Sequence, residues 1–407
     1  MPILVGFCLL LISTTVQTIE ELKLVHVVFT HKTHAPVEDR QNGPKVEIQP
    51  NLTYAYFSEV PEDMFNENKL NMFNLGVYLR QRYGDFLGEI YTENVTTLVT
   101  NQFVTSMMSG SLVNAGLWPP ASIQRWHDDL PWQPIPTVYE ELKKDYLLMG
   151  NLCPNFLSDT ASVLESDSMK EQVSVYKPLF DELNQRTGLT IDQPSEIEGL
   201  YITLETMADA NQSLPAWSAD IFPDGQMYFA TLLSYNLSSI TKLQKRLNGG
   251  ALLKKIIDDS VAHLAGNISN DHKIMMYSGD ERNVAGILQN LNLWSPHIPS
   301  EGAAVIFEVY EINKDDGYSV KVLYYTGVDG EMINLTLSEC TELCPLTNFS
   351  DILSDVLPTN AKTLCGWNVS GDIEEENSPV ENSSPNRENS ESLLVFLHVV
   401  YIWRVLT

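Results

Sequence analysis

Residues Leu22–Pro36 read LKLVHVVFTHKTHAP and begin with an almost unbroken run of apolar, β-forming side chains. A Val-rich run of this length, with little polar alternation, predicts a strand that is buried on both faces of a sheet. In open α/β sheets, ligands bind beyond the carboxyl ends of such strands. The polar residues that follow the run therefore occupy the expected ligand position, and they are Thr30, His31, Lys32, Thr33 and His34.

The composition indicates a folded, strongly acidic protein. The chain has 407 residues, of which 43% are hydrophobic and 19% are charged, enough for a large core in one or two domains. Acidic residues outnumber basic ones by 53 to 25, which gives a formal net charge of −28. A surface of this charge repels nucleic acid and anionic membranes, so neither is an expected partner.

Further elements follow from the spacing of apolar residues. An amphipathic helix is predicted over Asn68–Leu87, and another from about Phe103 to Leu117. Residues 155–262 have a helical pattern with breaks at Leu214–Trp217 and Asn248–Gly250. The remaining predicted elements are the strands Val95–Thr100, Lys273–Ser278, Ala303–Glu311 and Ser319–Thr326, and the helix Asn283–Leu293.

Several of these segments resemble signatures of the histidine acid phosphatases, in particular the prostatic, lysosomal and insect venom types. The family motif at the end of the first strand is Arg-His-Gly-x-Arg-x-Pro, and this chain keeps its histidine and proline as His31 and Pro36. The stretches RQRYGDFL, WQPIPTV and KRLNGGALLKKII are further family hallmarks. The resemblance covers about residues 20 to 370. It implies an α/β fold with a central mixed sheet, flanking helices and an α-helical lid inserted over about residues 155–262.

The resemblance also implies a reaction, in which His31 attacks a phosphomonoester to form a phosphohistidine that water then hydrolyses. Three arginines and a histidine would hold the phosphate, and an acidic residue would protonate the leaving alcohol. This chain replaces the arginines with Thr30, His34 and Thr105, and the histidine with Asp280. Glu281 stands at the position of the acid.

These replacements predict a phosphatase-like protein that is catalytically impaired or inactive. A phosphoryl group spreads negative charge over its oxygens and is best held by the bidentate forks of arginine. Losing one positioned oxyanion donor costs a factor of ~10²–10³ in rate. Lys32 and His34 retain some positive charge but offer no fork. The alternative is an active acid phosphatase that hydrolyses phosphomonoesters through His31.

The candidate residues also have other interpretations. His31 can be a structural histidine at a strand end, with its ring hydrogen-bonded within the protein and no catalytic role. Asp280 and Glu281 stand where a helix is expected to begin, so they can act as a cap and complement the helix dipole. A third possibility is a zinc-type site made by His31, His34, Asp280 and Glu281. The favoured prediction has neither a metal nor another cofactor.

The N-terminus and the cysteines predict export. Residues 1–17 contain an uncharged apolar run followed by small polar residues, which is typical of a signal peptide, and the run is shorter than the ~20 residues of a membrane span. The cysteines that remain are even in number and suggest two disulfides rather than a metal site: Cys153, Cys340, Cys344 and Cys365. Three pairings are open on the residues alone, and the resemblance implies Cys153–Cys365 and Cys340–Cys344.

Nine glycosylation sequons fit an exported glycoprotein. They lie at Asn51, Asn94, Asn211, Asn236, Asn267, Asn334, Asn348, Asn368 and Asn382.

The end of the chain changes in composition. After a phosphatase-like domain over residues 18–370, residues 371–392 are rich in Glu, Asn, Ser and Pro and predict a disordered linker. Residues 393–407 are hydrophobic and resemble a GPI-attachment signal, or else a tail left by an alternative transcript end. The expected location is therefore extracellular, with the cell surface or the lysosome as alternatives. A homodimer is a further expectation from the resemblance.

Overall fold

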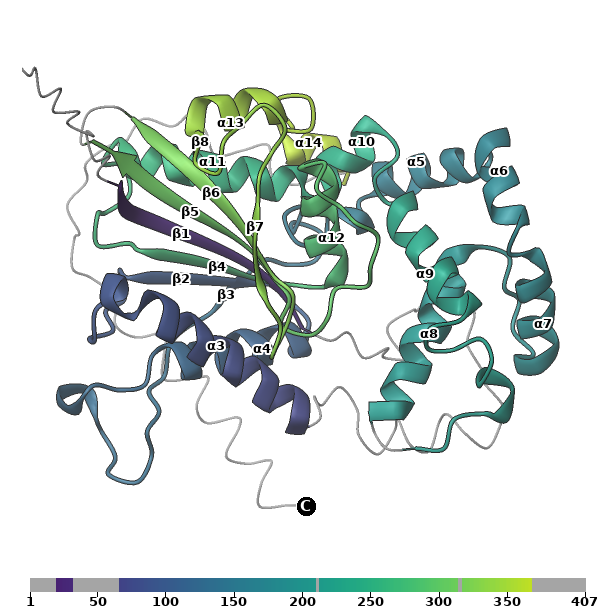
Figure 1. The fold of residues 1–407 in the computed structure, drawn as a ribbon, viewed down its shortest axis with the longest axis horizontal. Helices are drawn as coiled ribbons and strands as arrows, with labels where there is room; N and C mark the ends of the chain where they lie inside the picture. The colour runs from purple at the N-terminus through teal and green to yellow at the C-terminus, as the bar shows by residue number, and fades with distance from the viewer. Residues whose placement is uncertain (1–19, 32–65, 210–211, 314–316, 368–407) are drawn as a thin grey trace, which may run out of the picture. The chain divides into compact units, whose positions relative to one another are not determined.

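Strand β1 (Glu20–Thr30) lies inside a mixed sheet of eight strands (Figure 1). Its last seven residues are buried, which confirms the prediction from its apolar run. The computed structural model describes residues 20–31, 66–209, 212–313 and 317–367. The other strands are β2 (Thr96–Thr100), β3 (Val138–Tyr139), β4 (Ile274–Gly279), β5 (Ala304–Ile312), β6 (Tyr318–Tyr325), β7 (Met332–Leu335) and β8 (Cys344–Pro345).

The strand order is β3-β2-β4-β1-β5-β6-β7, and β8 pairs with β6. Strands β1, β2, β3 and β4 run parallel to one another, whereas β5, β6 and β7 add antiparallel ribbons beyond β1. The carboxyl ends of the four parallel strands therefore lie at one edge of the sheet, which is the edge where ligands are expected. The predicted central mixed sheet is confirmed.

Helices cover both faces of the sheet (Figure 1). One face packs against α3 (Asn66–Leu87) and α4 (Val104–Leu117), with Leu75, Leu79 and Val113 in the shared core. The other face packs against α11 (Ala251–Leu264), α12 (Glu281–Asn290) and α13 (Leu346–Leu353). Two separate apolar cores result, as in other α/β folds with a sheet between helical layers.

Two glycines allow α3 and α4 to pack closely. A Cβ atom on Gly76 would lie 2.1 Å from the carbonyl oxygen of Val113, and one on Gly116 would lie 2.2 Å from that of Phe73. Any larger side chain at either position would force the helices apart. This close pairing fixes the start of α3 relative to the start of α4, and both starts lie near the ligand edge.

A helical part follows the first half of the sheet and has its own core. Helices α7 (Lys177–Thr187), α8 (Pro194–Asp209) and α9 (Gln226–Leu237) bury Leu183, Leu204 and Met227 against one another. The rest of this part consists of α5 (Pro154–Leu164), α6 (Asp167–Ser174) and α10 (Lys242–Lys245). Short helical turns occur at Ser122–Gln124, Gly150–Leu152, Ala216–Ser218 and Arg246–Gly250.

The predicted break at Asn248–Gly250 is a sharp turn before α11. Gly249 has φ +94°, which a residue with a side chain rarely adopts, and a Cβ there would lie 2.7 Å from the backbone of Gly286. The turn brings α11 back onto the sheet, where Leu252 and Ile256 join the sheet core. Helix α11 thus packs with the sheet, although it falls mostly within the range expected for the lid. The domain boundaries themselves stay a prediction.

Both expected disulfides are present. Cys153–Cys365 joins the beginning of α5 to the last described helix, α14 (Ala361–Cys365), across 212 positions of sequence. Cys340–Cys344 closes a short loop before α13. The pairing implied by the family resemblance is therefore confirmed.

The RQRYGDFL hallmark serves packing away from the ligand edge. Arg82 donates to the buried carboxylate of Glu308 on β5 at 2.7 Å, and the hydroxyl of Tyr83 donates to the same oxygen at 2.8 Å. Arg80 lies over the ring of Trp118, with its guanidinium carbon 5.5 Å from the ring centre.

Within the described ranges, no helix combines the length and apolar character that a bilayer crossing requires.

Candidate functional site

Four of the predicted site residues, Thr30, His31, Asp280 and Glu281, lie at or directly after the carboxyl ends of β1 and β4. Thr30 pairs with Gly279 in the parallel ladder between these strands. His31 is the residue after Thr30 and Asp280 is the residue after Gly279, so both directly follow the last pair of this ladder. The structure therefore brings together two segments that are about 250 residues apart in sequence.

Thr30 and His31 are both buried. His31 is 4% exposed, and Thr30 is fully buried. The hydroxyl of Thr30 donates to the carbonyl oxygen of His31 at 2.9 Å, and the Thr30 carbonyl accepts from the backbone N–H of Gly302 at 3.0 Å. The Thr30 side chain is thus used to hold the backbone at the strand end.

Thr105 lies in the first turn of α4, which is fastened to the end of β4. The hydroxyl of Ser106 donates to the carbonyl oxygen of Ser278 at 2.8 Å, and the hydroxyl of Ser278 donates back to the carbonyl of Ser106 at 3.1 Å. This reciprocal pair holds the N-terminus of α4 at the ligand edge. Thr105 is half-buried and carries only a short hydroxyl side chain.

Asp280 caps helix α12, as one of the interpretations of the sequence expects. Its carboxylate accepts from the backbone N–H of Asn283 at 3.1 Å, and the Asn283 side chain accepts from the N–H of Asp280 at 2.9 Å. Burial raises the pKa of the Asp280 carboxyl, and the nearby Arg282 guanidinium opposes that shift. Glu281 follows in the first turn of the helix, where a negative charge suits the helix dipole.

Arg282 provides a guanidinium close to the site, but the helical part holds it. It forms an ion pair with Glu198 of α8, and it donates to the hydroxyl of Ser238 at 2.7 Å. The hydroxyl of Ser234 donates to the same Glu198 carboxylate at 2.6 Å, and the Arg282 guanidinium lies 5.4 Å from the ring centre of Tyr235. These contacts tie α12 to α8 and α9.

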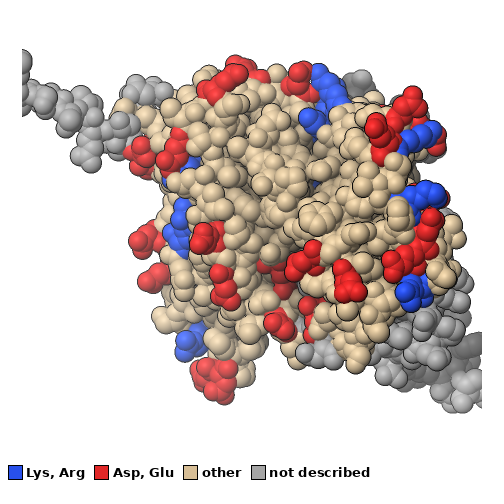
Figure 2. Space-filling view, turned by 45° about the vertical axis from the view of Figure 1, so that its right-hand side comes forward, with Lys and Arg blue, Asp and Glu red and all other residues tan. Residues whose placement is uncertain are grey.

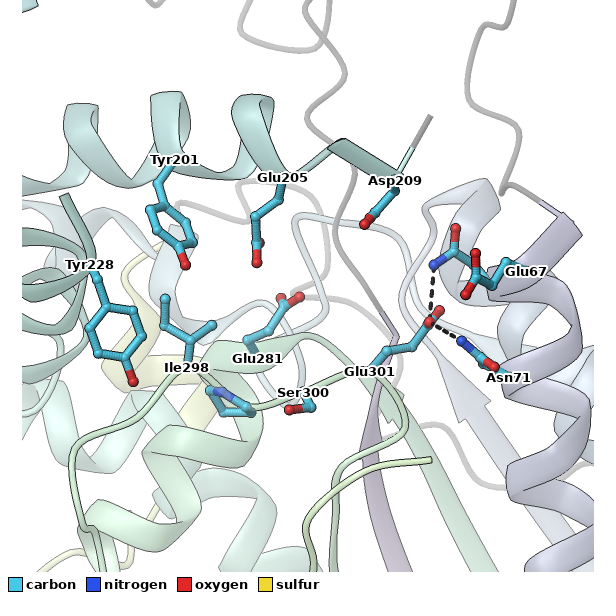
Figure 3. A pocket seen from close by; sticks show the side chains of 12 residues that line it. Glu67, Asn71, Tyr201, Glu205, Asp209, Tyr228, Glu281, Ile298, Ser300 and Glu301 are labelled. Carbon is cyan, nitrogen blue, oxygen red and sulfur yellow. Dashed lines mark hydrogen bonds between the residues drawn. The ribbon is translucent and has the colours of Figure 1, made fainter. Parts of the chain in front are cut away.

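A cavity of about 580 Å³ opens beside Glu281 (Figure 3). The described residues that line it come from α3, α8, α9, the start of α12 and the loop before β5. They are Glu67, Asn68, Asn71, Tyr201, Glu205, Asp209, Tyr228, Glu281, Ile298, Pro299, Ser300 and Glu301. Five of these carry carboxylates, and none of them is a lysine, an arginine or a histidine.

The face drawn in Figure 2 carries more acidic than basic side chains. Figure 2 shows several acidic side chains near the middle of the face, whereas the basic side chains lie nearer its edges. Asn68 and Asn71 donate to Glu301 at 3.0 and 2.8 Å. These amides offset part of the local negative charge without adding a positive one.

Some predicted residues cannot be placed. Lys32, His34 and Pro36 lie outside the described residues, as do the sequons at Asn51, Asn211, Asn368 and Asn382. The expected signal peptide, linker and hydrophobic tail lie outside them as well.

Within the described ranges, no group of three or more histidines, cysteines and carboxylates is placed to hold a metal ion.

The sequence did not single out most of the cavity. Tyr201, Glu205 and Asp209 recur at intervals of four residues on α8 and therefore share one face of that helix. That spacing was a usable signal, but it says nothing about what the face meets. No sequence pattern indicated that Glu67 and Glu301 belong to a site, because they join the cavity only through the packing of α3 and of the loop before β5.

Comparison with known proteins agrees with this architecture. A model of the histidine phosphatase superfamily (branch 2) matches residues 14–325. Venom acid phosphatase Acph-1 of Apis mellifera is 35% identical over 345 residues, which cover 85% of this chain and 88% of that protein. Prostatic acid phosphatase of Rattus norvegicus is 30% identical over 372 residues, covering 88% and 93% of the two chains.

The chain thus belongs to the histidine phosphatase superfamily, branch 2, and its curated relatives include acid phosphatases. Among solved structures, Hafnia alvei phytase in complex with tartrate aligns with a TM-score of 0.62 over 85% of this chain and 98% of the phytase. The two sequences are 16% identical, so this similarity concerns the fold alone.

Proposed function

We propose that this chain is a secreted, glycosylated acid-phosphatase-like protein that hydrolyses phosphomonoesters weakly or not at all. One observation carries the proposal: threonines and carboxylates stand at the ligand edge where the family has arginines and a histidine. Thr30, Thr105 and Asp280 occupy three of those positions among the described residues. A bound phosphate would meet short hydroxyls and negative charge instead of cationic donors.

The physical argument concerns the donors that a phosphoryl group requires. The transition state spreads charge over the phosphoryl oxygens, and catalysis depends on fixed donors that are already aimed at them. The Thr30 hydroxyl is used on the backbone, and the Asp280 carboxylate is used as a helix cap. Neither group can hold phosphate in its present arrangement.

The nearby arginines do not supply the missing charge. Arg282 is held by Glu198 and Ser238 and is not among the described residues that line the cavity. Arg82 is paired with Glu308. A buried guanidinium that left such a partner would leave an uncompensated carboxylate behind, at a cost of roughly 3–5 kcal/mol.

Export is part of the same proposal. The apolar N-terminus, the nine sequons and the two disulfides all fit a protein that matures in an oxidising compartment. Relatives named for venom and prostate, together with lysosomal ones, agree with a destination outside the cytosol. Anchoring through residues 393–407 and pairing into a homodimer remain further proposals.

The alternative is a working acid phosphatase that acts through His31. Its support is the position of His31 at the end of β1, next to the end of β4, and the 35% identity to a venom acid phosphatase. In that case Glu281 would have to protonate the leaving alcohol in place of an aspartate.

Turnover of p-nitrophenyl phosphate between pH 4 and pH 7 separates the two functions. We expect the secreted protein to show no turnover above that of its His31→Ala variant. A rate on the order of 1–10³ s⁻¹, typical of enzymes, that is lost in His31→Ala would establish the alternative.

A further inference from the structure

Helix α11 packs on the sheet with two chemically different halves (Figure 1). Its first half contributes apolar side chains to the sheet core, and they are Leu252, Leu253, Ile256 and Ile257. The buried side chains of its second half are all polar, and they are Asp259, Ser260 and His263. Apolar burial does not depend on pH, whereas contacts that involve histidines do. The two halves of the helix can therefore respond differently to acid.

Two further histidines lie beneath the polar half of α11. His26 of β1 is fully buried, and its Nε2 lies 3.1 Å from the hydroxyl oxygen of Ser260. His272 stands in the loop just before β4, and the charges of His26, His263 and His272 act on one another. These three residues come from a strand, a helix and a loop, and we call them the histidine cluster.

The histidine cluster offers few acceptors for an added proton. Nδ1 of His26, both ring nitrogens of His263 and Nε2 of His272 are buried and make no hydrogen bond within the described part of the chain. The ring of His263 lies near the backbone of His272, and the ring of His272 lies near the backbone of Asn94. A protonated imidazole carries two N–H donors, and a buried donor without an acceptor is costly.

Burial and nearby positive charge keep the cluster neutral. Burial is the largest effect on all three histidines and lowers the pKa of each, to about 3 for His26. Lys255 of α11 adds to this effect on His26 and His272, and Lys23 of β1 adds to it on His263. The folded protein thus holds these rings uncharged at pH values where exposed histidines are protonated.

The carboxylates nearest to the cluster are already engaged. Both oxygens of Asp259 accept from Lys255 at 2.6 Å, and one of them also accepts from the hydroxyl of Tyr277 at 3.3 Å. The other lysine, Lys23, is held by two carboxylates, those of Glu21 and Glu311. A proton added to the cluster is therefore not balanced by a new ion pair, and the folded arrangement disfavours it.

We propose that the histidine cluster is an acid-sensitive switch: protonation of His26, His263 and His272 releases the second half of α11 and the turn after it, residues 259–273, while the first half stays packed. The open form binds protons more tightly, because its rings reach water, so acid shifts the equilibrium toward opening. His272 lies at the amino end of β4, whereas the ligand edge lies at the carboxyl end. The inference therefore goes beyond the proposed function and does not depend on it.

Hydrogen exchange read by mass spectrometry tests the switch on the full secreted chain. Labelling is done at pH 7 and pH 5, with times scaled to the intrinsic exchange rate at each pH. We expect the opening constant of residues 259–273 to rise at least ~25-fold at pH 5, the effect of His26 alone for a pKa of 6.5 when open and about 3 when closed. His263 and His272 should add to the rise, whereas exchange of residues 253–257 should change far less.

Variants assign the rise to the cluster. His26→Gln should reduce it by about 25-fold, because one proton-binding group is lost while an amide remains beside Ser260. The triple variant His26→Gln, His263→Gln and His272→Gln should leave residues 259–273 with almost no pH dependence. The matched control is His127→Gln, which removes an exposed histidine outside the cluster and should preserve the full rise.

Three results would overturn the proposal. The first is no rise in opening between pH 7 and pH 5, and the second is an equal rise in both halves of α11, which would indicate a general loosening by acid. The third is a triple variant that folds and keeps the rise. The comparison of the two halves is made on the unmodified protein, so it decides the question even where a variant fails to fold.

Discussion

At the scale of single residues, the proposed loss of activity depends on the side chains around His31 at the ligand edge. His31 follows β1 directly, and Asp280 follows β4 at the neighbouring position. Thr30 and Asp280 have both taken on structural roles, one holding a strand end and the other capping a helix. Neither side chain needs a bound phosphate to complete its hydrogen bonds, because those bonds are made within the protein.

Restoring the family residues together should restore phosphate chemistry. The combined variant Thr30→Arg, His34→Arg, Thr105→Arg, Asp280→His and Glu281→Asp should raise turnover of p-nitrophenyl phosphate by at least ~10², the effect of one positioned donor. Thr30→Arg alone should change little, because the donors act as a unit.

The restored protein also needs its own controls. Asp280→His removes a helix cap, which costs roughly 0.5–2 kcal/mol, so thermal unfolding is measured beside activity. His31→Ala in the restored background should abolish the gain. Turnover that persists without His31 would show that the restored site does not work through a phosphohistidine.

His26 offers a residue-scale test of stability against pH. It is fully buried on β1, and its Nε2 lies 3.1 Å from the hydroxyl of Ser260 on α11. Burial, with smaller effects of Lys255, His272 and His263, lowers the pKa of His26 to about 3. The folded protein therefore holds it neutral, whereas the unfolded chain protonates it near pH 6.5.

The sign of the effect follows from this difference. A pKa that is lowered on folding contributes stability above the unfolded value, and this stability is lost as the pH falls from 6.5 toward 3. Each pH unit in that window removes ~1.4 kcal/mol of unfolding free energy. His26→Gln should therefore lose less stability between pH 7 and pH 4 than the unmodified protein, by about 3 kcal/mol.

Urea unfolding at the two pH values measures this change. The control is His127→Gln, which alters an exposed histidine and should leave the pH dependence unchanged. Parallel pH profiles for the unmodified protein and His26→Gln would mean that other groups govern the acid sensitivity.

The sequence allowed β1 and the residues at its end to be predicted, because that information is local. A Val-rich run with polar residues after it has one simple explanation in an α/β protein. The cavity could not be predicted in the same way. Glu67, Glu205, Glu281 and Glu301 are far apart in the chain, and only the packed structure shows that they share one space.

At the scale of elements, the local signals were accurate within a few residues. The helix predicted to start at Asn283 begins at Glu281, because Asp280 caps it through the backbone of Asn283. The strand predicted over Lys273–Ser278 is observed at Ile274–Gly279. Apolar spacing identifies the body of an element, whereas its ends depend on capping contacts that are made in three dimensions.

The role of α11 was harder to infer. Its helical pattern resembles that of the helices before it, yet it packs on the sheet and not on α7, α8 and α9. The difference arises at the turn of Asn248–Gly250, where Gly249 allows the chain to change direction. Sequence shows that a break exists there, but not the direction in which the chain leaves it.

The disulfide Cys153–Cys365 should matter more for stability than Cys340–Cys344. The first closes a loop of 212 positions, and both of its cysteines are buried beside Phe156 and Leu247. The second closes a loop of only four positions. In the loop-entropy treatment, the long loop contributes about 3 kcal/mol more than the short one.

Chemical unfolding of two double variants measures this difference. Cys153→Ala with Cys365→Ala should lower the unfolding free energy by several kcal/mol, whereas Cys340→Ala with Cys344→Ala should lower it by less. An equal or reversed order would show that loop length does not govern these two bonds.

At the scale of the whole molecule, the chain has a formal net charge of −28 and nine sequons, five of which lie among the described residues. Asn94, Asn267 and Asn348 are exposed and can carry glycans without disturbing the described core. Asn334 is also exposed and lies on β7, which ends the main strand order of the sheet. A glycan there would shield that edge from pairing with another chain.

Asn236 is the exception among the described sequons, and it provides the last prediction. It is half-buried on α9, and its side-chain oxygen accepts from the indole N–H of Trp294 at 3.1 Å. Ser238, the third residue of its sequon, is 5% exposed and accepts from Arg282 at 2.7 Å. A bulky glycan on Asn236 would have to leave through this packed region, at the point where α9 meets α12.

We therefore expect the folded, secreted protein to carry glycans at Asn94, Asn267, Asn334 and Asn348, and none at Asn236. Enzymatic deglycosylation in heavy-oxygen water, followed by peptide mass spectrometry, marks each occupied asparagine. Asn236→Gln should leave the mass of the glycosylated protein almost unchanged, whereas Asn267→Gln should remove one glycan. Occupancy at Asn236 would mean that the contact between α9 and α12 opens to admit a sugar chain, and a protein without any glycan would contradict export through the secretory pathway.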